Sequence, residues 1–351
     1  KGYLEQETIR QTEEAFQRFK HVAENYGIQR LRAVATSAVR EASNGALLIE
    51  RVLKESGIEI EAISGEEEAR LIHLAVVHML NLKNKRSMLI DIGGGSVEVT
   101  ISTGQNIVST ESYNMGTVRL LEKLDTRDNS KHPFGKLVRE YAEAARQRIE
   151  RDIGAEKIQV CAGTGGNVEE IGRLRQKLFK ADSDRFIMLD ELAELIERLN
   201  RLSYAERISK LKLRPDRADV ILPAAIVLHM IASETGVKQI AIPNVGLKDG
   251  ILLDIAEDLS RSPRPQRREQ AWESALHMGR KFQFDEKHAR LTAQLSACLF
   301  EQSKILHELD DSNLLLLEMA ALLHDIGHFI NTVDHENHGY YLLSVNRLIG
   351  L

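Results

Sequence analysis

The fold is decided by the stretch Leu89-Ile90-Asp91-Ile92-Gly93-Gly94-Gly95-Ser96-Val97-Glu98-Val99. It predicts an apolar strand that ends in a carboxylate, a tight turn, and a second strand that alternates apolar and polar residues. Because glycine has no Cβ atom, the backbone N–H groups of such a turn can close around phosphate oxygens. Asp91 and Glu98 flank the turn, where carboxylates can hold Mg²⁺ or orient water. We therefore predict a phosphate-binding turn made of Gly93, Gly94, Gly95 and Ser96.

A second acidic stretch precedes this turn, Ser64-Gly65-Glu66-Glu67-Glu68-Ala69-Arg70-Leu71. Ser64 and Glu67 fit a capping box, which predicts a helix that begins here and ends near Leu80. The three glutamates could simply favour the helix N-terminus electrostatically. They point in different directions on a helix, so we expect only one of them to reach the glycine turn. Together, the two stretches suggest phosphoryl hydrolysis.

Two further features are candidate phosphate ligands. Gly163, Thr164 and Gly165 follow a strand expected over 157–162 and precede a helix, so a second phosphate or nucleotide loop is plausible there. Arg40 follows a strand expected over 28–35, and ligands often bind at the carboxyl ends of strands in α/β sheets. The alternatives are an ordinary turn and a surface arginine.

Histidines gather near the end of the sequence. His324 and Asp325 follow an apolar helical stretch, and His288 lies upstream as a further candidate ligand. His328, His335 and His338 add to the group. One histidine on an apolar helix face is usually a core residue, but several beside an aspartate also suit a metal or anion site. Both interpretations stay open at this stage.

Helices and strands alternate along most of the chain, which is typical of an α/β fold. The expected strands cover residues 28–35, 58–63, 87–102 with its turn, 105–112, 157–162 and 239–243. The expected helices cover residues 4–25, 43–57, 64–80, 116–124, 135–152, 189–202, 216–235 and 248–259. We expect Pro223 to kink the helix that contains it. A polar, proline-containing linker over 260–268 precedes a tail whose segments all have helical patterns.

Composition limits the function classes. The chain has 351 residues, 43% of them hydrophobic, with no stretch near the roughly 18 apolar residues of a membrane span and no signal-peptide pattern. Two separated cysteines indicate a reducing cytoplasm. Because the net charge is −5, an anionic substrate requires a local basic patch. The candidates for a polyanion channel, which could equally form a solvated face, are Lys210, Lys212, Arg214, Arg217, Arg267 and Arg268.

Several motifs, in order, resemble the exopolyphosphatase/guanosine pentaphosphate phosphatase family. They are the two stretches above, Ala35-Thr36-Ser37-Ala38-Val39-Arg40-Glu41-Ala42, Gly163-Thr164-Gly165-Gly166 and Gly246-Leu247-Lys248-Asp249-Gly250. The resemblance implies two actin-like, ribonuclease-H-like α/β domains around a cleft, at residues 1–72 and 73–258. The tail, residues 259–351, resembles an all-helical HD-type domain.

The resemblance also implies an activity, namely release of the terminal phosphate from inorganic polyphosphate with Mg²⁺ or Mn²⁺. By position, Glu68 matches the family's catalytic carboxylate, while Asp91 and Glu98 match acids that organise metal and water. The glycine turn matches a phosphate loop and Arg40 a phosphate-contacting arginine. A cytoplasmic homodimer is expected, without nucleic-acid or integral membrane partners.

Three departures from the family pattern affect the expected activity. The family's first phosphate loop is absent and would lie upstream of Lys1, and the last aspartate of an HD-type site would lie beyond Leu351. We therefore expect no firmly held metal at His288, His324 and Asp325 in this chain. Asn167 replaces a threonine that is common in the family.

Two alternatives to an exopolyphosphatase remain. A guanosine pentaphosphate 5′-phosphohydrolase would be favoured by a base-stacking pocket, although aromatic residues are only 5% of the chain. A binding module that senses polyphosphate or alarmones without turnover is disfavoured by Glu68 and favoured by the missing first loop.

Overall fold

The computed structural model describes residues 2–123, 138, 143, 146–150, 153, 157–259, 265–346 and 348. The chain divides into two compact units. The first comprises residues 1–81, 86–99 and 111–261, and the second comprises residues 82–85, 100–110 and 262–351. Most of the helix expected over 135–152 and half of the expected linker lie outside the described residues. The predicted boundary after residue 72 stays a prediction.

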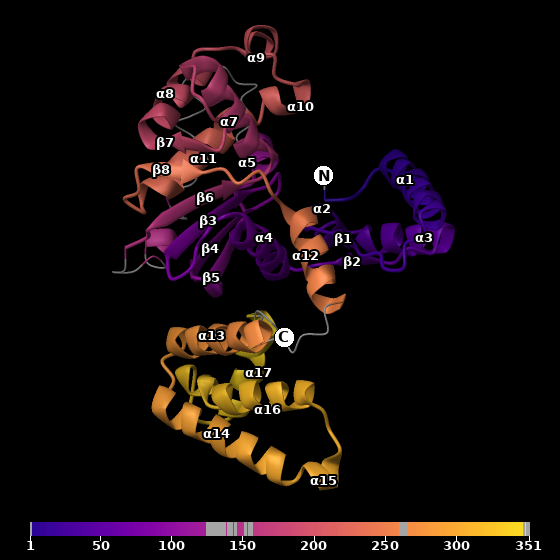
Figure 1. The fold of residues 1–351 in the computed structure, drawn as a ribbon, viewed down its shortest axis with the longest axis vertical. Helices are drawn as coiled ribbons and strands as arrows, with labels where there is room; N and C mark the ends of the chain where they lie inside the picture. The colour runs from indigo at the N-terminus through magenta and orange to yellow at the C-terminus, as the bar shows by residue number, and fades with distance from the viewer. Residues whose placement is uncertain are drawn as a thin grey trace. The chain divides into compact units, whose positions relative to one another are not determined.

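A six-stranded sheet forms the centre of the α/β part, in the order β5-β4-β3-β6-β8-β7 (Figure 1). Its strands are β3 (Arg86–Ile92), β4 (Val97–Thr103), β5 (Asn106–Tyr113), β6 (Val160–Thr164), β7 (Phe186–Met188) and β8 (Gln239–Ala241). β6 lies parallel to both β3 and β8, while β7 is antiparallel to β8. β3 is buried from Ser87 to Ile92, as expected for a nearly continuous apolar run in an inner strand.

The alternating apolar and polar residues of β4 are typical of a strand with one exposed face, but both faces of β4 are buried. Its polar residues Glu98, Thr100 and Ser102 are only 3%, 1% and 1% exposed. The Thr100 hydroxyl forms a 3.1 Å hydrogen bond with the hydroxyl of Thr110 on β5. Buried polar groups require such partners, so the second face of β4 is a hydrogen-bonded interior surface.

Helices follow the strands of this part of the chain. They are α4 (Gly65–Met79), α5 (Thr117–Lys123), α7 (Gly166–Phe179), α8 (Leu189–Asn200), α9 (Tyr204–Leu211), α10 (Pro215–Ala218), α11 (Ile221–Ser233) and α12 (Leu247–Leu259). α11 is apolar on all sides and packs against α7, α8 and β3, so it is a core helix.

The helix expected over 216–235 with a kink at Pro223 is instead two helices, and that prediction is wrong in its detail. A turn at Asp219 and Val220 separates α10 from α11, although both residues keep backbone angles of the αR region. Pro223 is the third residue of α11. A backbone N–H at that position has no acceptor within the helix, so proline fits there without a kink.

A separate small sheet lies near the start of the chain. It pairs β1 (Ala33–Ala35) in parallel with β2 (Ile60–Ala62), and three helices accompany it: α1 (Gln6–Asn25), α2 (Ser37–Arg40) and α3 (Gly45–Ser56). Its core consists of Ile9, Leu48, Val52 and Ile60. The strand expected over 28–35 is therefore reduced to its last three residues, because only these pair with β2.

Helices α4 and α12 approach each other unusually closely at Gly250. A Cβ atom on this glycine would lie 1.9 Å from the carbonyl oxygen of Leu71 in α4. Only glycine fits this contact. The motif Gly246-Leu247-Lys248-Asp249-Gly250 is thus explained in part by helix packing.

An ion-pair cluster holds the same helices to the β1–β2 region. Asp254 of α12 accepts hydrogen bonds from Arg32 at 2.8 Å and from Arg70 of α4 at 2.9 Å. Glu67 accepts from Arg70 at 2.7 Å and from Arg32 at 3.3 Å. Each carboxylate therefore bridges both arginines, and the cluster joins α4 and α12 to Arg32, the residue just before β1.

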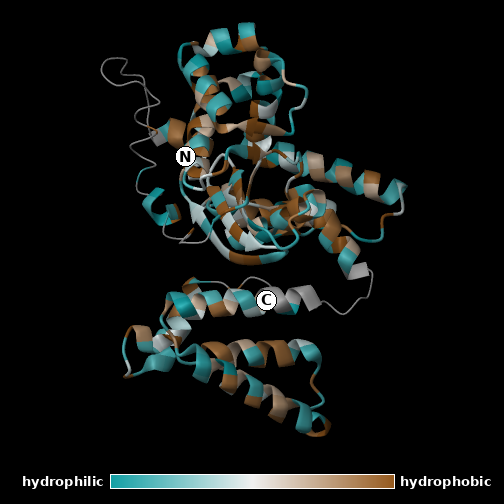
Figure 2. Cartoon of the chain, turned by 60° about the vertical axis from the view of Figure 1, so that its left-hand side comes forward, coloured by the Kyte–Doolittle hydropathy of each residue, from teal (hydrophilic) through white to brown (hydrophobic). Residues whose placement is uncertain are grey.

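The second unit contains the helices expected for the tail. They are α13 (Pro265–Lys281), α14 (Glu286–Gln302), α15 (Lys304–His307), α16 (Asp311–Leu323), the 3₁₀ helix η1 (Ile326–Phe329) and α17 (His335–Val345). Small residues, among them Ala271, Ala275, Ala289 and Ala293, contribute to their common core. Figure 2 shows hydrophobic and hydrophilic residues side by side on these helices, as amphipathic packing requires. Among the described residues, no helix has the length and hydrophobicity to span a membrane.

The contact at Gly250 generates a stability prediction. Gly250→Ala should lower the free energy of unfolding by roughly 3 kcal/mol or more, because the added methyl group collides with backbone that cannot retreat. Gly246→Ala is the matched control, since a Cβ there meets no atom within 4 Å, and it should change stability by less than about 1 kcal/mol. Urea unfolding of both variants measures the difference. Equal stability of the two variants would contradict the proposed packing role.

Candidate phosphate site

The parallel register of β3 and β6 places the first acid of the site. Asp91 of β3 is the direct partner of Thr164 of β6. The Thr164 hydroxyl donates a 2.5 Å hydrogen bond to Asp91 Oδ1. Asp91 is only 8% exposed, and burial raises the pKa of its carboxyl, while the hydrogen bond from Thr164 opposes that rise. The predicted acid at the strand end is therefore buried and oriented by the neighbouring strand.

Glu98 is the second acid, and it lies on β4 just after the turn. Its Oε1 accepts a 3.0 Å hydrogen bond from the hydroxyl of Ser112 on β5. Burial raises the pKa of Glu98, and the charge of Asp91 adds to this rise. A Cβ placed on Gly65 would lie 4.0 Å from Glu98 Oε1, so the start of α4 is next to this carboxylate.

Glu68 is the glutamate of α4 that interacts electrostatically with both acids. Ser64 caps the helix by accepting a 3.1 Å hydrogen bond from the Glu67 backbone N–H. The Glu67 side chain does not return the bond, because it pairs with Arg70 and Arg32, so the predicted capping box is only half formed. Burial and the charges of Glu98 and Asp91 raise the pKa of Glu68 to about 8.

The carbonyl groups of the glycine turn accept hydrogen bonds from the start of α5 and from Gly116, the residue just before α5. The Gly93 carbonyl accepts from the Thr117 N–H at 3.1 Å, that of Gly94 from the Val118 N–H at 3.0 Å, and that of Gly95 from the Gly116 N–H at 3.3 Å. In the part of the chain that the structure describes, the N–H groups of Gly94 and Gly95 donate to no protein acceptor. The turn thus exposes backbone N–H donors, while its carbonyl acceptors are occupied by other hydrogen bonds. This arrangement favours an anionic ligand.

Two residues at this turn were missed by the sequence analysis. Arg119 of α5 donates from Nε to the Gly95 carbonyl at 2.8 Å and from Nη2 to Glu41 at 2.6 Å. The hydroxyl of Ser37 would lie 2.7 Å from a Cβ on Gly95, so it crowds the turn from α2. No motif signals Arg119, whereas Ser37 lies inside a stretch already noted for Arg40.

A cavity of about 530 Å³ opens beside the turn. Its lining includes Gly94, Gly95, Ser37 and Arg119. This volume lies within the range of small-molecule sites. The cavity therefore brings the donors of the turn, a hydroxyl group and a guanidinium group next to one open space, which Glu41 and Glu122 also line.

The second glycine loop follows β6 and lies against the first. Gly165 has a positive φ of 97°, and a Cβ on it would lie 2.7 Å from the Ile92 carbonyl oxygen, so no other residue fits. Arg217 donates to Asn167 at 3.0 Å, and Asn167 donates to the Thr117 hydroxyl at 3.5 Å. Thr117 in turn donates to the Gly93 carbonyl at 3.5 Å. Asn167, at the position that departs from the family pattern, thus connects the two loops.

Arg40 and the predicted channel residues have different environments. Arg40 donates a 2.6 Å hydrogen bond to the Ile63 carbonyl, just before the cap of α4, and its charge opposes the pKa rise of Glu68. Arg217 also lies against Gly166, so it belongs to the second loop. Lys210 and Arg214 are exposed and pair with Glu206 and Asp216.

The remaining channel candidates have surroundings of their own or are not described. Lys212 is an exposed residue at the end of α9, and Arg268 pairs with Glu318 in the helical unit. The side chain of Arg267 lies outside the described residues. A polyanion channel through these residues stays a prediction.

The donor set fits a hard divalent cation. Asp91 and Glu98 are buried carboxylates whose pKa values are raised, and Glu68 joins them electrostatically. Mg²⁺ and Mn²⁺ prefer oxygen ligands of this kind. A bound cation would relieve the mutual repulsion of the acids, so the arrangement favours the expected metal position.

Fold and site together define a class of protein. A mixed sheet with glycine loops after β3 and β6, acids beside them and a helical C-terminal region is the architecture of an actin-like α/β phosphatase. Residues 1–259 match the Ppx/GppA phosphatase family, and residues 271–351 match Ppx/GppA phosphatase, domain III. The chain therefore belongs to the Ppx/GppA phosphatase family, and the predicted family and fold class are confirmed.

Solved structures share this fold at low sequence identity. An exopolyphosphatase from Cytophaga hutchinsonii is 23% identical with a TM-score of 0.67, and the match covers 74% of this chain and 85% of that chain. The Ppx/GppA family member from Aquifex aeolicus is 22% identical with a TM-score of 0.64 and the same coverage. An exopolyphosphatase-like protein is 23% identical with a TM-score of 0.62, covering 73% of this chain and 87% of that chain.

The raised pKa of Glu68 predicts how stability depends on pH without metal. In a chelator, the folded state keeps a proton on Glu68 between about pH 4.5 and about pH 8 that the unfolded state has released. The free energy of unfolding should therefore fall as the pH rises through this range. Glu68→Gln cannot lose such a proton, so its stability should fall less.

Urea unfolding at about pH 5 and about pH 8 tests this linkage. Glu66→Gln, in the same helical turn, is the control and should keep the wild-type slope. Identical slopes for wild type and Glu68→Gln would show that Glu68 titrates normally.

Proposed function

We propose that this protein is an exopolyphosphatase, which hydrolyses the terminal phosphoanhydride bond of inorganic polyphosphate. The observation that carries the proposal is the acid group Asp91, Glu98 and Glu68 beside a glycine turn whose Gly94 and Gly95 N–H groups have no acceptor among the described residues. Membership of a phosphatase family supports the reaction class. A cavity at the turn supports a phosphate substrate.

In the proposed mechanism, the N–H groups of Gly94 and Gly95 hold oxygens of the terminal phosphate, and Arg40 adds positive charge. Glu68 takes a proton from a water molecule while the water oxygen attacks the terminal phosphorus. The bond from this phosphorus to the bridging oxygen breaks, which releases orthophosphate and a polyphosphate shorter by one residue. Such a reaction depends mainly on positioning and charge stabilisation, which these residues supply.

Asp91 and Glu98 would hold Mg²⁺ or Mn²⁺ in this mechanism. The cation, when bound, supplies charge neutralisation for the phosphoryl oxygens. It also favours the ionised form of Glu68, because a nearby positive charge lowers the pKa of a carboxyl group. Ionised Glu68 is the form that can accept a proton.

A guanosine pentaphosphate 5′-phosphohydrolase is the second candidate. One observation favours it: Tyr3 lines the cavity together with Gly94 and Gly95. An aromatic ring near a phosphate site can stack on a nucleobase. The exposed Tyr3 ring is therefore a candidate base contact, and a polyphosphate substrate would make no such use of it.

A side-by-side assay decides between the two candidates. Phosphate release by the full-length protein is measured with polyphosphate and with guanosine pentaphosphate, each with and without Mg²⁺. The proposal expects the higher kcat/KM with polyphosphate. A higher kcat/KM with guanosine pentaphosphate would favour the second candidate, and binding without turnover of either substrate would favour a sensor.

The role of Glu68 predicts a specific kinetic defect. Glu68→Gln in the full-length protein should lower kcat by roughly 10²–10⁴-fold, which is the usual contribution of a general base, with little change in KM. Glu66→Gln should stay within about twofold of wild type, because Glu66 has no part in the proposed mechanism. A kcat near the wild-type value in Glu68→Gln would reject the assignment, and Glu67 would be tested next.

The contact of Arg217 with the second loop predicts a binding defect. Arg217→Gln should raise KM for polyphosphate by about tenfold, since a charge-assisted contact contributes roughly 1.5–3 kcal/mol. Arg173→Gln is the control, because Arg173 is an exposed residue of α7 that pairs only with glutamates of its own helix among the described residues. Steady-state kinetics measure both variants. An unchanged KM in Arg217→Gln would leave Arg217 as a structural tie to Asn167.

A further inference from the structure

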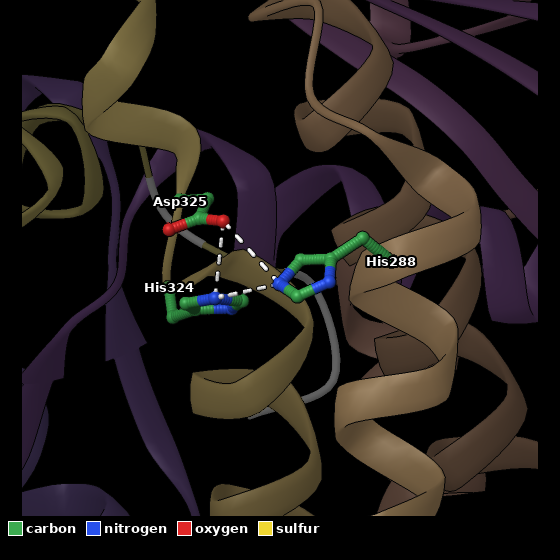
Figure 3. A group of neighbouring side chains, drawn as sticks. All are labelled: His288, His324 and Asp325. Atoms are coloured by element: carbon green, nitrogen blue, oxygen red, sulfur yellow. Dashed lines mark hydrogen bonds and ion pairs between the residues drawn. The ribbon is translucent and has the colours of Figure 1, made fainter. Parts of the chain in front are cut away.

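The histidine and aspartate side chains expected as ligands in the helical tail do lie together. His288 Nε2, His324 Nε2 and Asp325 Oδ2 are between 3.1 and 3.6 Å from one another, and Figure 3 shows these atoms turned toward one another. The expectation that this chain holds no metal firmly there stays a prediction.

In the α/β part of the chain, Arg119 of α5 joins the glycine turn to the end of α2. Its Nε donates to the Gly95 carbonyl at 2.8 Å, and its Nη2 donates to the Glu41 carboxylate at 2.6 Å. Nε and Nη2 lie on one edge of the planar guanidinium group, so a single orientation of the side chain makes both bonds. Glu41 follows directly after α2, next to Arg40. Arg119 therefore fixes the turn relative to the end of α2.

The bond from Arg119 also sets the direction of the next N–H group in the turn. In a trans peptide, the carbonyl of one residue and the N–H of the following residue point in opposite directions. Among the described residues, no peptide bond is cis. The Gly95 carbonyl points at Arg119, so the Ser96 N–H points away from α5.

The two preceding peptides of the turn have the same orientation. The Gly93 and Gly94 carbonyls accept hydrogen bonds from N–H groups at the start of α5. The N–H groups of Gly94 and Gly95 are therefore directed to the opposite side, as the Ser96 N–H is. Three successive backbone donors thus face the same way.

The Ser96 N–H is a donor for which the protein provides no acceptor among the residues that the structure describes. Ser96 is only 5% exposed, so little of its surface is open to water. Buried backbone N–H groups are almost always paired, because an unpaired one is destabilising. A Cβ on Gly116 would lie 2.4 Å from the Ser96 nitrogen, so the peptide is also packed closely from the α5 side. The donor is therefore held in place for an acceptor from a ligand.

We propose that Arg119 is a positioning residue, which orients the Ser96 N–H so that the turn binds one phosphoryl group with three successive N–H donors. The proposal rests on the proposed function of the turn as a phosphate site. Convergent backbone N–H groups form an anion-binding concavity, and donors that are oriented in advance need no reorganisation when the anion binds. Arg119 acts through the peptide, and its ion pair with Glu41 holds the guanidinium group in place.

A direct contact between Arg119 and the anion is the competing explanation, and the ion pair with Glu41 distinguishes the two. If Arg119 bound the anion, removal of Glu41 would release the guanidinium group and strengthen binding. If Arg119 orients the peptide, removal of Glu41 loosens its hold on the turn and weakens binding. Glu122 lines the same cavity, so Glu122→Ala is the matched control for a simple loss of negative charge.

Isothermal titration calorimetry with imidodiphosphate and Mg²⁺ measures anion binding by the full chain. Arg119→Gln and Glu41→Ala should each weaken binding by about tenfold, because one hydrogen bond to a charged group is lost. The double variant should bind no more weakly than Arg119→Gln, since both changes remove the same effect. Glu122→Ala should not weaken binding. Tighter binding by Glu41→Ala, wild-type affinity in Arg119→Gln, or no binding by the wild type would each overturn the proposal.

This measurement does not depend on turnover, because the P–N–P bridge of imidodiphosphate resists hydrolysis. Failure of the proposed hydrolase activity is seen in the polyphosphate assay, whereas failure of the Arg119 assignment is seen in the affinity for imidodiphosphate. The two failures are therefore distinguishable.

Amide chemical shifts identify the donor that Arg119 controls. In ¹H–¹⁵N spectra of the wild type, imidodiphosphate should move the Gly94, Gly95 and Ser96 amide signals downfield. In Arg119→Gln, the shift of Ser96 should be lost while those of Gly94 and Gly95 remain. Circular dichroism checks the fold of each variant, and Glu41→Ala, which should show a reduced Ser96 shift, replaces Arg119→Gln if the latter does not fold. A Ser96 signal that does not respond in the wild type, or responds equally in the variants, would overturn the proposal.

Discussion

The parallel pairing of β3 with β6 is the constraint on which the candidate site depends. It sets Asp91 opposite Thr164, so the acid is oriented by a hydroxyl from the adjacent strand. It also brings the two glycine loops together, because each loop follows directly after its strand. The backbone at Gly165 passes so close to Ile92 that a side chain would prevent the pairing. The register of the central sheet therefore determines which residues of the site are in contact.

The three carboxylates of the candidate site are destabilising when they are ionised and no cation is bound. Asp91, Glu98 and Glu68 lie close enough to influence one another, and burial raises the pKa of each. Carboxyl groups in such surroundings either keep protons or bind a cation. Arg40 offsets part of the repulsion but donates its hydrogen bond to the Ile63 carbonyl. Clustering these acids lowers the stability of the fold and raises its affinity for cations. Such arrangements are common at reactive centres.

Local signals in the sequence predicted the local parts of the site. The glycine turn, its flanking acids and the helix start at Ser64 all follow from residue types at short spacing. Arg119 and the chain of contacts through Asn167 could not be predicted, because they depend on how α5 and α7 pack against the turn. The break before Pro223 was missed because a proline in a helical pattern indicates a disruption without saying on which side it falls. The buried polar face of β4 likewise depends on partners from β5.

The bond from Arg217 to Asn167 has an ordinary length of 3.0 Å, whereas the bonds from Asn167 to Thr117 and from Thr117 to Gly93 are long, at 3.5 Å each. The two long bonds are weak, so they add little to the tight backbone contact of Gly165 with Ile92. The distance between the two loops is therefore set mainly by the pairing of β3 with β6, and the side chains of Asn167 and Thr117 fill the space between them without fixing it.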